Sequence, residues 1–288
     1  METGDLSVEG IAGNKLYQQR GRIVLPILVR QAKARQTIAY SELAAEVPMP
    51  NPRNLNYVLG AVGNSILDLG RTWNARVPPI EALVVNQETG LPGVGVCWFT
   101  PDPDVYRGAP QQLRRHIVDA MLSEVYAFRK WDRVLGGLDL QPLPPTSLAV
   151  PPVSAVAAGA RGGESKAHHE LKNAVAFHPE WVGLPRCMAP GEIEVPMYSG
   201  DRVDVVFTSG HRRVAVEVKT AGAPPAELVR GMFQCVKYSA VLQAEARVAQ
   251  SDQEGSALLA LGGAMPADLR ALRSILGVEV RENVAVGT

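Results

Sequence analysis

The sequence has little cysteine and no long apolar run. Its 288 residues include three cysteines (Cys97, Cys187 and Cys235), none of them in a CxxC pair. This argues against a disulfide scaffold or a zinc knuckle and favours a reducing compartment. The longest apolar runs, residues 82–85 and 257–261, fall far short of the ~20 residues that span a bilayer. Since the first five residues also lack the apolar core of a secretory signal, we expect a soluble cytoplasmic protein with no membrane partner.

The chain also lacks net charge, because 29 basic residues balance 29 acidic ones. Its overall charge therefore does not indicate a nucleic-acid-binding polycation. Locally, acidic residues are absent between Glu9 and Glu42. That stretch contains six basic residues: Lys15, Arg20, Arg22, Arg30, Lys33 and Arg35. Such a patch could contact phosphates, and a solvated helix face explains it equally well.

Proline, alanine and glycine concentrate in residues 136–163, where no helical or strand period is sustained. This composition is typical of a linker. The composition of the whole chain, 46% hydrophobic and 20% charged, is that of a globular protein. We therefore predict an α/β (α+β) chain with an N-terminal domain over 1–138, a linker over 139–162 and a C-terminal domain over 163–288.

Periodicity and cap residues predict the elements of the N-terminal domain. Ser41 is a good N-cap, and Asn51 followed by Pro52 is another. Pro26 is expected to start or kink the first helix. The predicted elements are helices over 15–35, 42–47, 52–69 and 111–135, and a two-stranded hairpin formed by 82–86 and 95–99.

A short helix, a turn, a longer helix and a two-stranded wing follow one another in the order of a winged helix-turn-helix domain. In such a domain the first turn of the second helix enters a DNA groove. That turn here carries Arg53, Asn54 and Asn56, whose side chains can hydrogen-bond base edges or phosphates. We predict that these three residues bind DNA; contact with a protein partner is the alternative.

Three features within residues 37–99 carry a family resemblance: Tyr40-Ser-Glu-Leu-Ala-Ala, the Asn51-Pro-Arg helix, and Val77-Pro-Pro-Ile before a glycine-rich hairpin. They resemble the DNA-binding domain of alkylguanine-DNA alkyltransferases and their alkyltransferase-like relatives. In that family a nucleophilic cysteine follows the proline, and an intercalating arginine lies on the helix. Pro79 and Ile80 stand at the cysteine's place here, and Asn56 stands at the arginine's. The resemblance implies a DNA-binding scaffold without alkyl-transfer chemistry.

Beyond the linker, the pattern predicts a mixed sheet flanked by helices. The predicted elements are helices over 163–176, 224–249 and 266–276, and strands beginning at 192 and covering 201–207, 213–219, 257–261 and 278–281. Residues 213–219 alternate, so that Val214, Val216 and Val218 share one face and Ala215, Glu217 and Lys219 share the other.

One group of residues in this half carries chemistry. A hairpin about Ser209-Gly210 places Asp204 and Glu217 near one end of adjacent strands, with Lys219 one step from Glu217 on the same face. Carboxylates from two strands are what a hard cation such as Mg²⁺ prefers. A bound metal activates water and neutralises phosphate charge, while Lys219 can orient or deprotonate water or stabilise developing charge. Exposed edge-strand charges are the alternative, but the valine-rich flanks favour a cleft.

This arrangement resembles the PD-(D/E)xK superfamily of restriction-endonuclease-like nucleases over residues 163–245. Gly200-Asp-Arg-Val-Asp204 is similar to its GxxD strand, and Glu217-Val-Lys219 to its ExK motif. On the next helix, Gln234 and Tyr238 are similar to the QxxxY signature, with a polar helix face and a core tyrosine as the alternative. The resemblance implies a restriction-endonuclease-like fold with catalytic roles for these five residues.

The resemblance also implies that an acidic residue or histidine of the first helix completes the metal site. Glu164 and His168 are four residues apart and share a helix face. We therefore predict Glu164 and His168 as metal ligands beside Asp204 and Glu217. Glu170 remains the alternative from the same helix.

Together these patterns predict a DNA endonuclease that depends on Mg²⁺ or Mn²⁺ and acts in restriction, phage defence or repair. Its partner would be double-stranded DNA, and cutting both strands would invite a homodimer. Two alternatives stay open: a DNA-binding or regulatory protein with a degenerate nuclease fold, and an RNA-directed nuclease.

Overall fold

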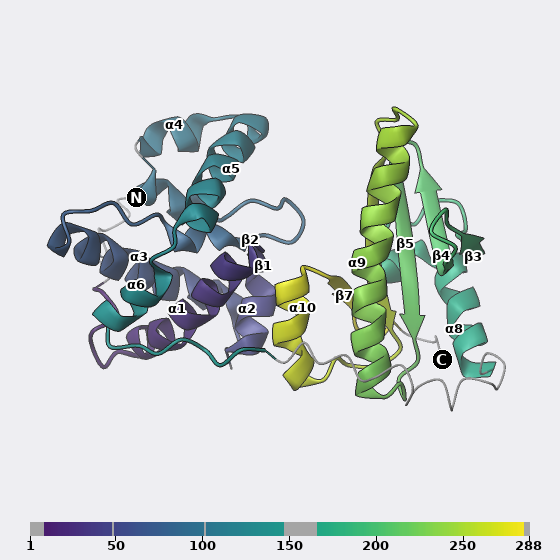
Figure 1. Ribbon diagram of the computed structural model, residues 1–288, viewed down its shortest axis with the longest axis horizontal. Coiled ribbons are helices and arrows are strands. Elements are labelled where there is room, and N and C mark those ends of the chain that lie inside the picture. The colour runs from purple at the N-terminus through teal and green to yellow at the C-terminus, as the bar shows by residue number, and fades with distance from the viewer. Residues whose placement is uncertain (1–8, 48, 101, 147–165, 285–288) are drawn as a thin grey trace. The chain divides into compact units, whose positions relative to one another are not determined.

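A computed structural model describes residues 9–47, 49–100, 102–146 and 166–284 of the chain (Figure 1). The fold is mixed α/β, and the chain divides into two compact units, residues 1–145 and 146–288. The division falls inside the predicted linker, most of which lies outside the described residues. No helix in the described ranges combines the length and apolar character that a membrane span requires.

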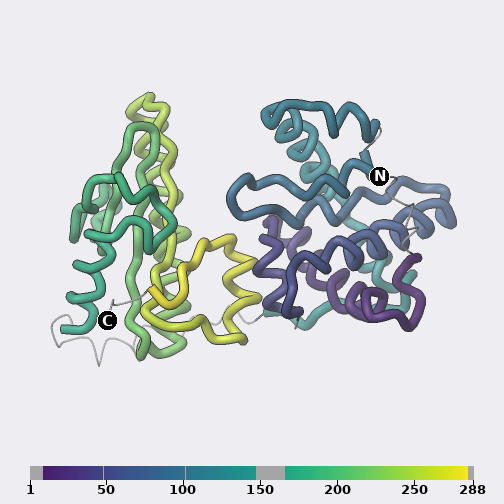
Figure 2. Tube along the Cα trace, turned by 180° about the vertical axis from the view of Figure 1, so that it is seen from behind, coloured from purple at the N-terminus to yellow at the C-terminus, as the bar shows by residue number. Residues whose placement is uncertain are grey.

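The first unit is mainly helical (Figure 2). Its long helices α1 and α3 pack against each other around a core that includes Leu25, Leu28 and Val62. A minimal parallel pairing joins β1 (Ile38–Ala39) to β2 (Val84–Val85). The helices are α1 (Leu16–Ala34), α2 (Tyr40–Glu46), α3 (Leu55–Thr72), α4 (Pro103–Gly108), α5 (Gln111–Ala127) and α6 (Trp131–Gly137), with 3₁₀ segments η1 (Pro52–Asn54), η2 (Ile80–Leu83) and η3 (Val94–Phe99).

The predicted two-stranded wing is wrong. Residues 95–99 belong to the 3₁₀ segment η3, and β2 pairs with β1 instead. The physical reason is the burial pattern: consecutive residues Val96 and Cys97 are both buried beneath Tyr106 and Met121, whereas a half-buried strand would alternate. The described part of the first unit therefore contains the predicted helices α2 and α3 but not the predicted wing.

Three helix predictions in this unit also need correction. The helix predicted over 111–135 is two helices, because the chain turns at Phe128 so that Trp131 is buried and its indole donates to the Val125 carbonyl (Nε1–O 3.0 Å). Ser41 caps nothing, since α2 already begins at Tyr40. Pro26 lies inside α1 and does not start it. The Asn51 cap is confirmed: its side chain accepts a hydrogen bond from the amide of Arg53 (3.0 Å).

The second unit is built on a five-stranded sheet of order β3-β4-β5-β6-β7. Strands β3, β4 and β5 pair antiparallel, and β5, β6 and β7 pair parallel. The elements are α8 (Lys166–Phe177), η4 (Pro179–Val182), β3 (Glu192–Pro196), β4 (Arg202–Ser209), β5 (Arg212–Lys219), α9 (Pro225–Val248), β6 (Glu254–Leu261), η5 (Ala267–Leu269), α10 (Arg270–Leu276) and β7 (Glu279–Arg281). The strands predicted for this half are confirmed.

Helices cover both faces of this sheet. The valines of β5 at positions 214, 216 and 218 pack with Leu171 and Val175 of α8. On the other face, Ala215 packs with Tyr238 and Leu242 of α9. The predicted division of β5 into two faces is therefore confirmed. The β4–β5 turn is short, and Gly210 there adopts a left-handed φ of 47°, which suits glycine.

One buried carboxyl stands out in the first unit. Glu81 of η2 is 5% exposed, and neither of its carboxylate oxygens has a hydrogen-bond partner within the described residues. Burial disfavours the charged form and raises the pKa of Glu81 from its ordinary 4.5 to about 8. The folded unit therefore holds a proton that the unfolded chain releases at neutral pH.

This proton makes stability depend on pH in a direction that can be tested. Below pH 4.5 the Glu81 carboxyl is protonated in both the folded and the unfolded chain, so the raised pKa does not change the free energy of unfolding. Between pH 4.5 and about pH 8 the raised pKa lowers that free energy increasingly, by at most about 5 kcal/mol. We expect Glu81→Gln, a neutral isostere, to gain stability over the parent as pH rises from 5 to 8.5. Urea unfolding followed by tryptophan fluorescence measures this, and an equal difference at both pH values would contradict it.

Candidate active site

The candidate site begins where β4 and β5 stop pairing. The last register pair at this end is Val205 opposite Val216, and Asp204 comes next on β4. The Asp204 carboxylate accepts a hydrogen bond from the Val218 amide (Oδ2–N 2.8 Å). A side chain thus takes over where backbone pairing ends, which fixes the carboxylate between the two strands.

Glu217 and Lys219 lie two residues apart on β5 and therefore on one face. The Lys219 ammonium donates to the Glu217 carboxylate (Nζ–Oε1 2.5 Å), and the Glu217 residue is only 4% exposed. Helix α9 covers this pair through Gly231, where an added Cβ would lie 3.4 Å from Lys219 Cε and 2.9 Å from Leu259 Cδ1. The glycine therefore allows the helix to pack closely over the ion pair.

Helix α8 adds a fourth side chain. His168 Nε2 lies 3.4 Å from Asp204 Oδ1, and both side chains are mostly buried. Helix α8 and the consecutive strands β4 and β5 thus bring His168, Asp204, Glu217 and Lys219 together. The predicted juxtaposition of Asp204, Glu217 and Lys219 is present, with His168 beside it.

The two carboxyl groups have opposite pKa shifts. Burial raises the pKa of Asp204, but hydrogen bonds from His168 and the Val218 amide outweigh it and hold that pKa below its ordinary value. Burial raises the pKa of Glu217, the nearby Asp204 charge raises it further, and Lys219 offsets this only in part. Asp204 is therefore readily ionised, whereas a nearby cation would stabilise the charged form of Glu217.

The negative charge extends to α9. Burial first, and the charge of Glu217 second, raise the pKa values of the Cys235 thiol and the Tyr238 hydroxyl. Both groups stay protonated at neutral pH. The region between the sheet and α9 is therefore one where a cation is favoured and a further anion is not.

Gln234 and Tyr238 contact each other as the QxxxY spacing predicts. Gln234 Nε2 donates to the Tyr238 hydroxyl (3.1 Å), which donates to the Arg202 carbonyl (3.3 Å). Tyr238 is buried with Val206, in line with the alternative of a core tyrosine. Gln234 Oε1 is buried without a hydrogen-bond partner in the described part of the chain. These contacts tie α9 to the start of β4, two residues from Asp204.

The donor set suits a hard divalent cation. Asp204 and Glu217 offer carboxylate oxygens of the kind that Mg²⁺ and Mn²⁺ prefer, and a cation would relieve the burial cost and mutual repulsion of Glu217 and Asp204. The described residues contain no group of three or more His, Cys, Asp or Glu side chains arranged to hold a metal. Glu164, the predicted helix ligand, lies outside those residues. The two carboxylates are thus the described groups that could hold a metal.

The alternative helix ligand, Glu170, is not brought to the site. It is exposed and lies 3.6 Å from Lys166 (Oε1–Nζ). A different buried pair is not among the predicted site residues. Lys172 of α8 is 1% exposed and forms an ion pair with Glu194 of β3. Lys172 follows His168 by four residues and so shares its helix face, but no pattern in the sequence pairs it with Glu194.

In the first unit, Arg53, Asn54 and Asn56 lie on η1 and the first turn of α3. All three are exposed, as is Tyr57 beside them, whereas Leu55 is fully buried. The predicted DNA-binding side chains thus share one accessible helix start.

The basic stretch at residues 15–35 is largely engaged within the unit. Lys15, Arg30 and Lys33 form ion pairs with Glu9, Glu46 and Asp132. Arg22 donates to the carbonyls of residues 11 and 13, and Arg35 lies 5.5 Å from the ring centroid of Tyr126. These contacts favour a structural role for the stretch over an open phosphate-binding patch.

Comparison with known proteins gives no further guide: no family model matches the chain, and neither curated proteins nor solved structures yield a match.

The coupling between the two carboxyls is open to direct measurement. Because the Asp204 charge raises the pKa of Glu217, Asp204→Asn should lower the Glu217 pKa, as read by carboxyl ¹³C NMR during a pH titration. Asp201→Asn is the matched control, since Asp201 lies three residues away and pairs with Lys237. A Glu217 pKa unchanged by Asp204→Asn would show that the two carboxylates are not coupled.

Proposed function

We propose that this protein is a divalent-metal-dependent nuclease that hydrolyses phosphodiester bonds in DNA. The observation that carries the proposal is the convergence of Asp204 and Glu217, on two adjacent strands, with Lys219 and His168. A buried carboxylate and a largely buried one beside a lysine suit hydrolysis of a phosphodiester better than they suit fold stability, because buried charges are costly to maintain.

In this proposal the two carboxylates hold the metal, with Mg²⁺ or Mn²⁺ as the candidate. When bound, such an ion makes hydroxide available at neutral pH and neutralises charge on the phosphate. The Val218 amide and His168 hold the Asp204 carboxylate in position, so that it would need little rearrangement to bind the metal. Lys219, held by Glu217 at 2.5 Å, would orient the attacking water or stabilise the charge that develops on the phosphate.

We assign substrate contact in the first unit to the exposed start of α3. Arg53 can pair with phosphate, and Asn54 and Asn56 can contact phosphate or base edges. The asparagine cap at Asn51 orders this turn before any ligand arrives. For cleavage of both strands we propose that two copies of the chain act on one duplex.

The first test is cleavage. With plasmid DNA, single-stranded DNA and RNA as substrates, we expect DNA cutting in Mg²⁺ or Mn²⁺ and none in EDTA. Asp204→Asn and Glu217→Gln should each lower the rate by about 100-fold or more, whereas Asp201→Asn should not. Cutting confined to RNA would make the protein a ribonuclease, and no cutting in either metal would support the non-catalytic alternative.

Lys219 can be examined separately from the metal ligands. Lys219→Met should retain metal binding, measured by calorimetry, yet lose roughly 100-fold in turnover. Lys219→Arg should rescue poorly, because the guanidinium is bulkier and keeps its proton, and because α9 leaves little space near Lys219 Cε at Gly231. A Lys219→Met enzyme that cuts at the parental rate would remove lysine from the mechanism.

The DNA-binding surface gives a further prediction. Arg53→Ala combined with Asn54→Ala should weaken duplex binding in fluorescence anisotropy and reduce the slope of log affinity against log salt by about 1. Arg71→Ala is the matched control, an exposed arginine at the other end of α3. Equal losses in the two variants would mean that the start of α3 has no special role.

A further inference from the structure

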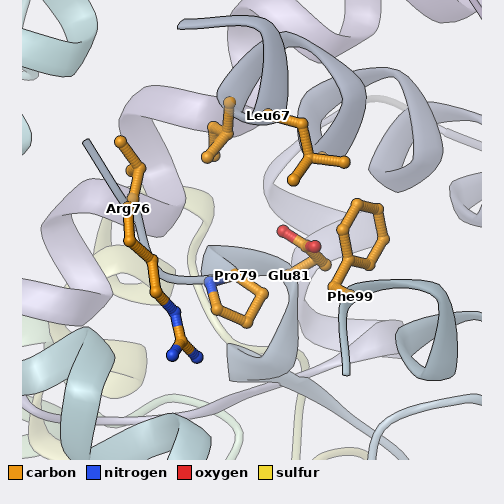
Figure 3. Close-up of a pocket in the computed structure, with 8 residues that line it drawn as sticks. Leu67, Arg76, Pro79, Glu81 and Phe99 are labelled. Carbon is orange, nitrogen blue, oxygen red and sulfur yellow. The ribbon is translucent and has the colours of Figure 1, made fainter. Parts of the chain in front are cut away.

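A small cavity in the first unit ends on an unpaired carboxyl. It measures about 90 Å³ and lies between α3, η2 and η3. In Figure 3 the Glu81 carboxylate points into the space between Leu67, Pro79 and Phe99. The complete lining is Gly63, Ile66, Leu67, Arg76, Val77, Pro79, Glu81 and Phe99. The cavity therefore has mainly apolar walls, and Glu81 and Arg76 are its two charged lining residues.

The Glu81 carboxyl has no hydrogen-bond partner in the part of the chain that the structure describes. Both Glu81 oxygens are buried and lack a hydrogen bond within the described residues. Arg76 is the other charged lining residue, but its guanidinium pairs with Glu124 of α5 (Nη2–Oε2 2.9 Å). A buried carboxyl with neither a hydrogen bond nor a counter-ion is costly to the fold, so its retention in an apolar pocket points to a ligand.

The space also restricts what can enter. A cavity of about 150 Å³ holds a benzene ring, so that a six-membered ring does not fit into the volume at Glu81. Gly63 of α3 sets this limit: a Cβ there would lie 2.1 Å from Phe99 Cζ and 3.0 Å from Glu81 Oε1. Only a small head group can reach the carboxyl.

We propose that this cavity binds the ammonium or guanidinium head group of a small organic cation, with Glu81 as the counter-ion and Leu67, Pro79 and Phe99 around the adjoining carbon. The head group would donate hydrogen bonds to both carboxylate oxygens, which no described residue pairs with. The cation would also lie beside the Phe99 ring, where aromatic contact favours positive charge. This site is separate from the proposed nuclease chemistry and does not depend on it.

Cation binding at Glu81 should depend on pH. The empty site holds a proton, because burial raises the pKa of Glu81 to about 8, and a cation must displace it. Affinity for a cation that stays charged should therefore rise by on the order of 100-fold between pH 6 and pH 9. Arg76, the other charged residue that lines the cavity, is paired with Glu124.

The test uses methylguanidinium and methylammonium as probes, with acetamide as a neutral probe of similar size. Binding to the full chain is followed by ¹H–¹⁵N NMR shifts at constant ionic strength at pH 6 and pH 9. We expect dissociation constants on the order of 1–10 mM for the cations at pH 9, weaker binding at pH 6, and shifts centred on Gly63, Glu81 and Phe99.

Variants decide whether Glu81 is responsible. Glu81→Gln should lower cation affinity at pH 9 at least 10-fold, and the exposed Glu88→Gln should leave it unchanged. Leu67→Trp keeps Glu81 but places a larger side chain in the cavity lining, and it should also abolish binding. This second variant tests the site even if the Glu81→Gln chain fails to fold. Cation binding that survives both variants, acetamide binding equal to that of the cations, or no shifts with either cation would overturn the proposal.

Discussion

The hydrogen bond between the Asp204 carboxylate and the Val218 amide is the interaction on which the candidate site depends. It occurs where the antiparallel pairing of β4 and β5 ends. Without it, Asp204 would have no fixed relation to the Glu217–Lys219 pair on the next strand. With it, both carboxylates are held where two inner strands stop pairing, in a sheet whose faces are covered by α8 and α9. His168 of α8 and Gly231 of α9 can therefore approach them from opposite sides.

This arrangement places charge where the fold gains little from it. Buried ion pairs such as Lys219–Glu217 seldom add net stability, because removing both charges from water costs about as much as their attraction returns. The valine and leucine clusters on both faces of the sheet therefore have to stabilise the unit. Such a separation between a stable apolar core and a charged edge is what a preorganised reaction site requires.

The second unit could be predicted well because its local patterns agree with its packing. Alternating residues in β5 face opposite helices, and glycine at position 210 provides the turn, so that Asp204 and Glu217 could be placed from the sequence alone. In the first unit, residue type and periodicity predict elements that differ from those formed by packing in the fold. Val96 looks like a strand residue, yet it is buried next to Cys97 in a 3₁₀ segment. Helix α5 ends at Ala127, where periodicity alone would continue it, and the buried Trp131 indole donates back to the Val125 carbonyl.

Other features depend on contacts between distant segments and left little trace in the sequence. Glu81 has no hydrogen-bond partner within the described residues because α3 and η3 close around its carboxyl. Lys172 forms an ion pair with Glu194 because α8 packs on the sheet. Such groups become visible once burial is known. Their chemistry could not have been read from residue type or spacing, since an isolated glutamate or lysine is usually exposed.

Paramagnetic relaxation by Mn²⁺ tests the central claim most directly, because it locates a bound ion without requiring any catalytic activity. Substoichiometric Mn²⁺ added to the ¹⁵N-labelled full chain should broaden the amide signals of Asp204, Glu217 and Val218 first, and Mg²⁺ should compete. The Asp204→Asn variant should lose this pattern. Broadening centred on other acidic residues, such as Glu88 or Asp201, or no selective broadening at all, would contradict the account.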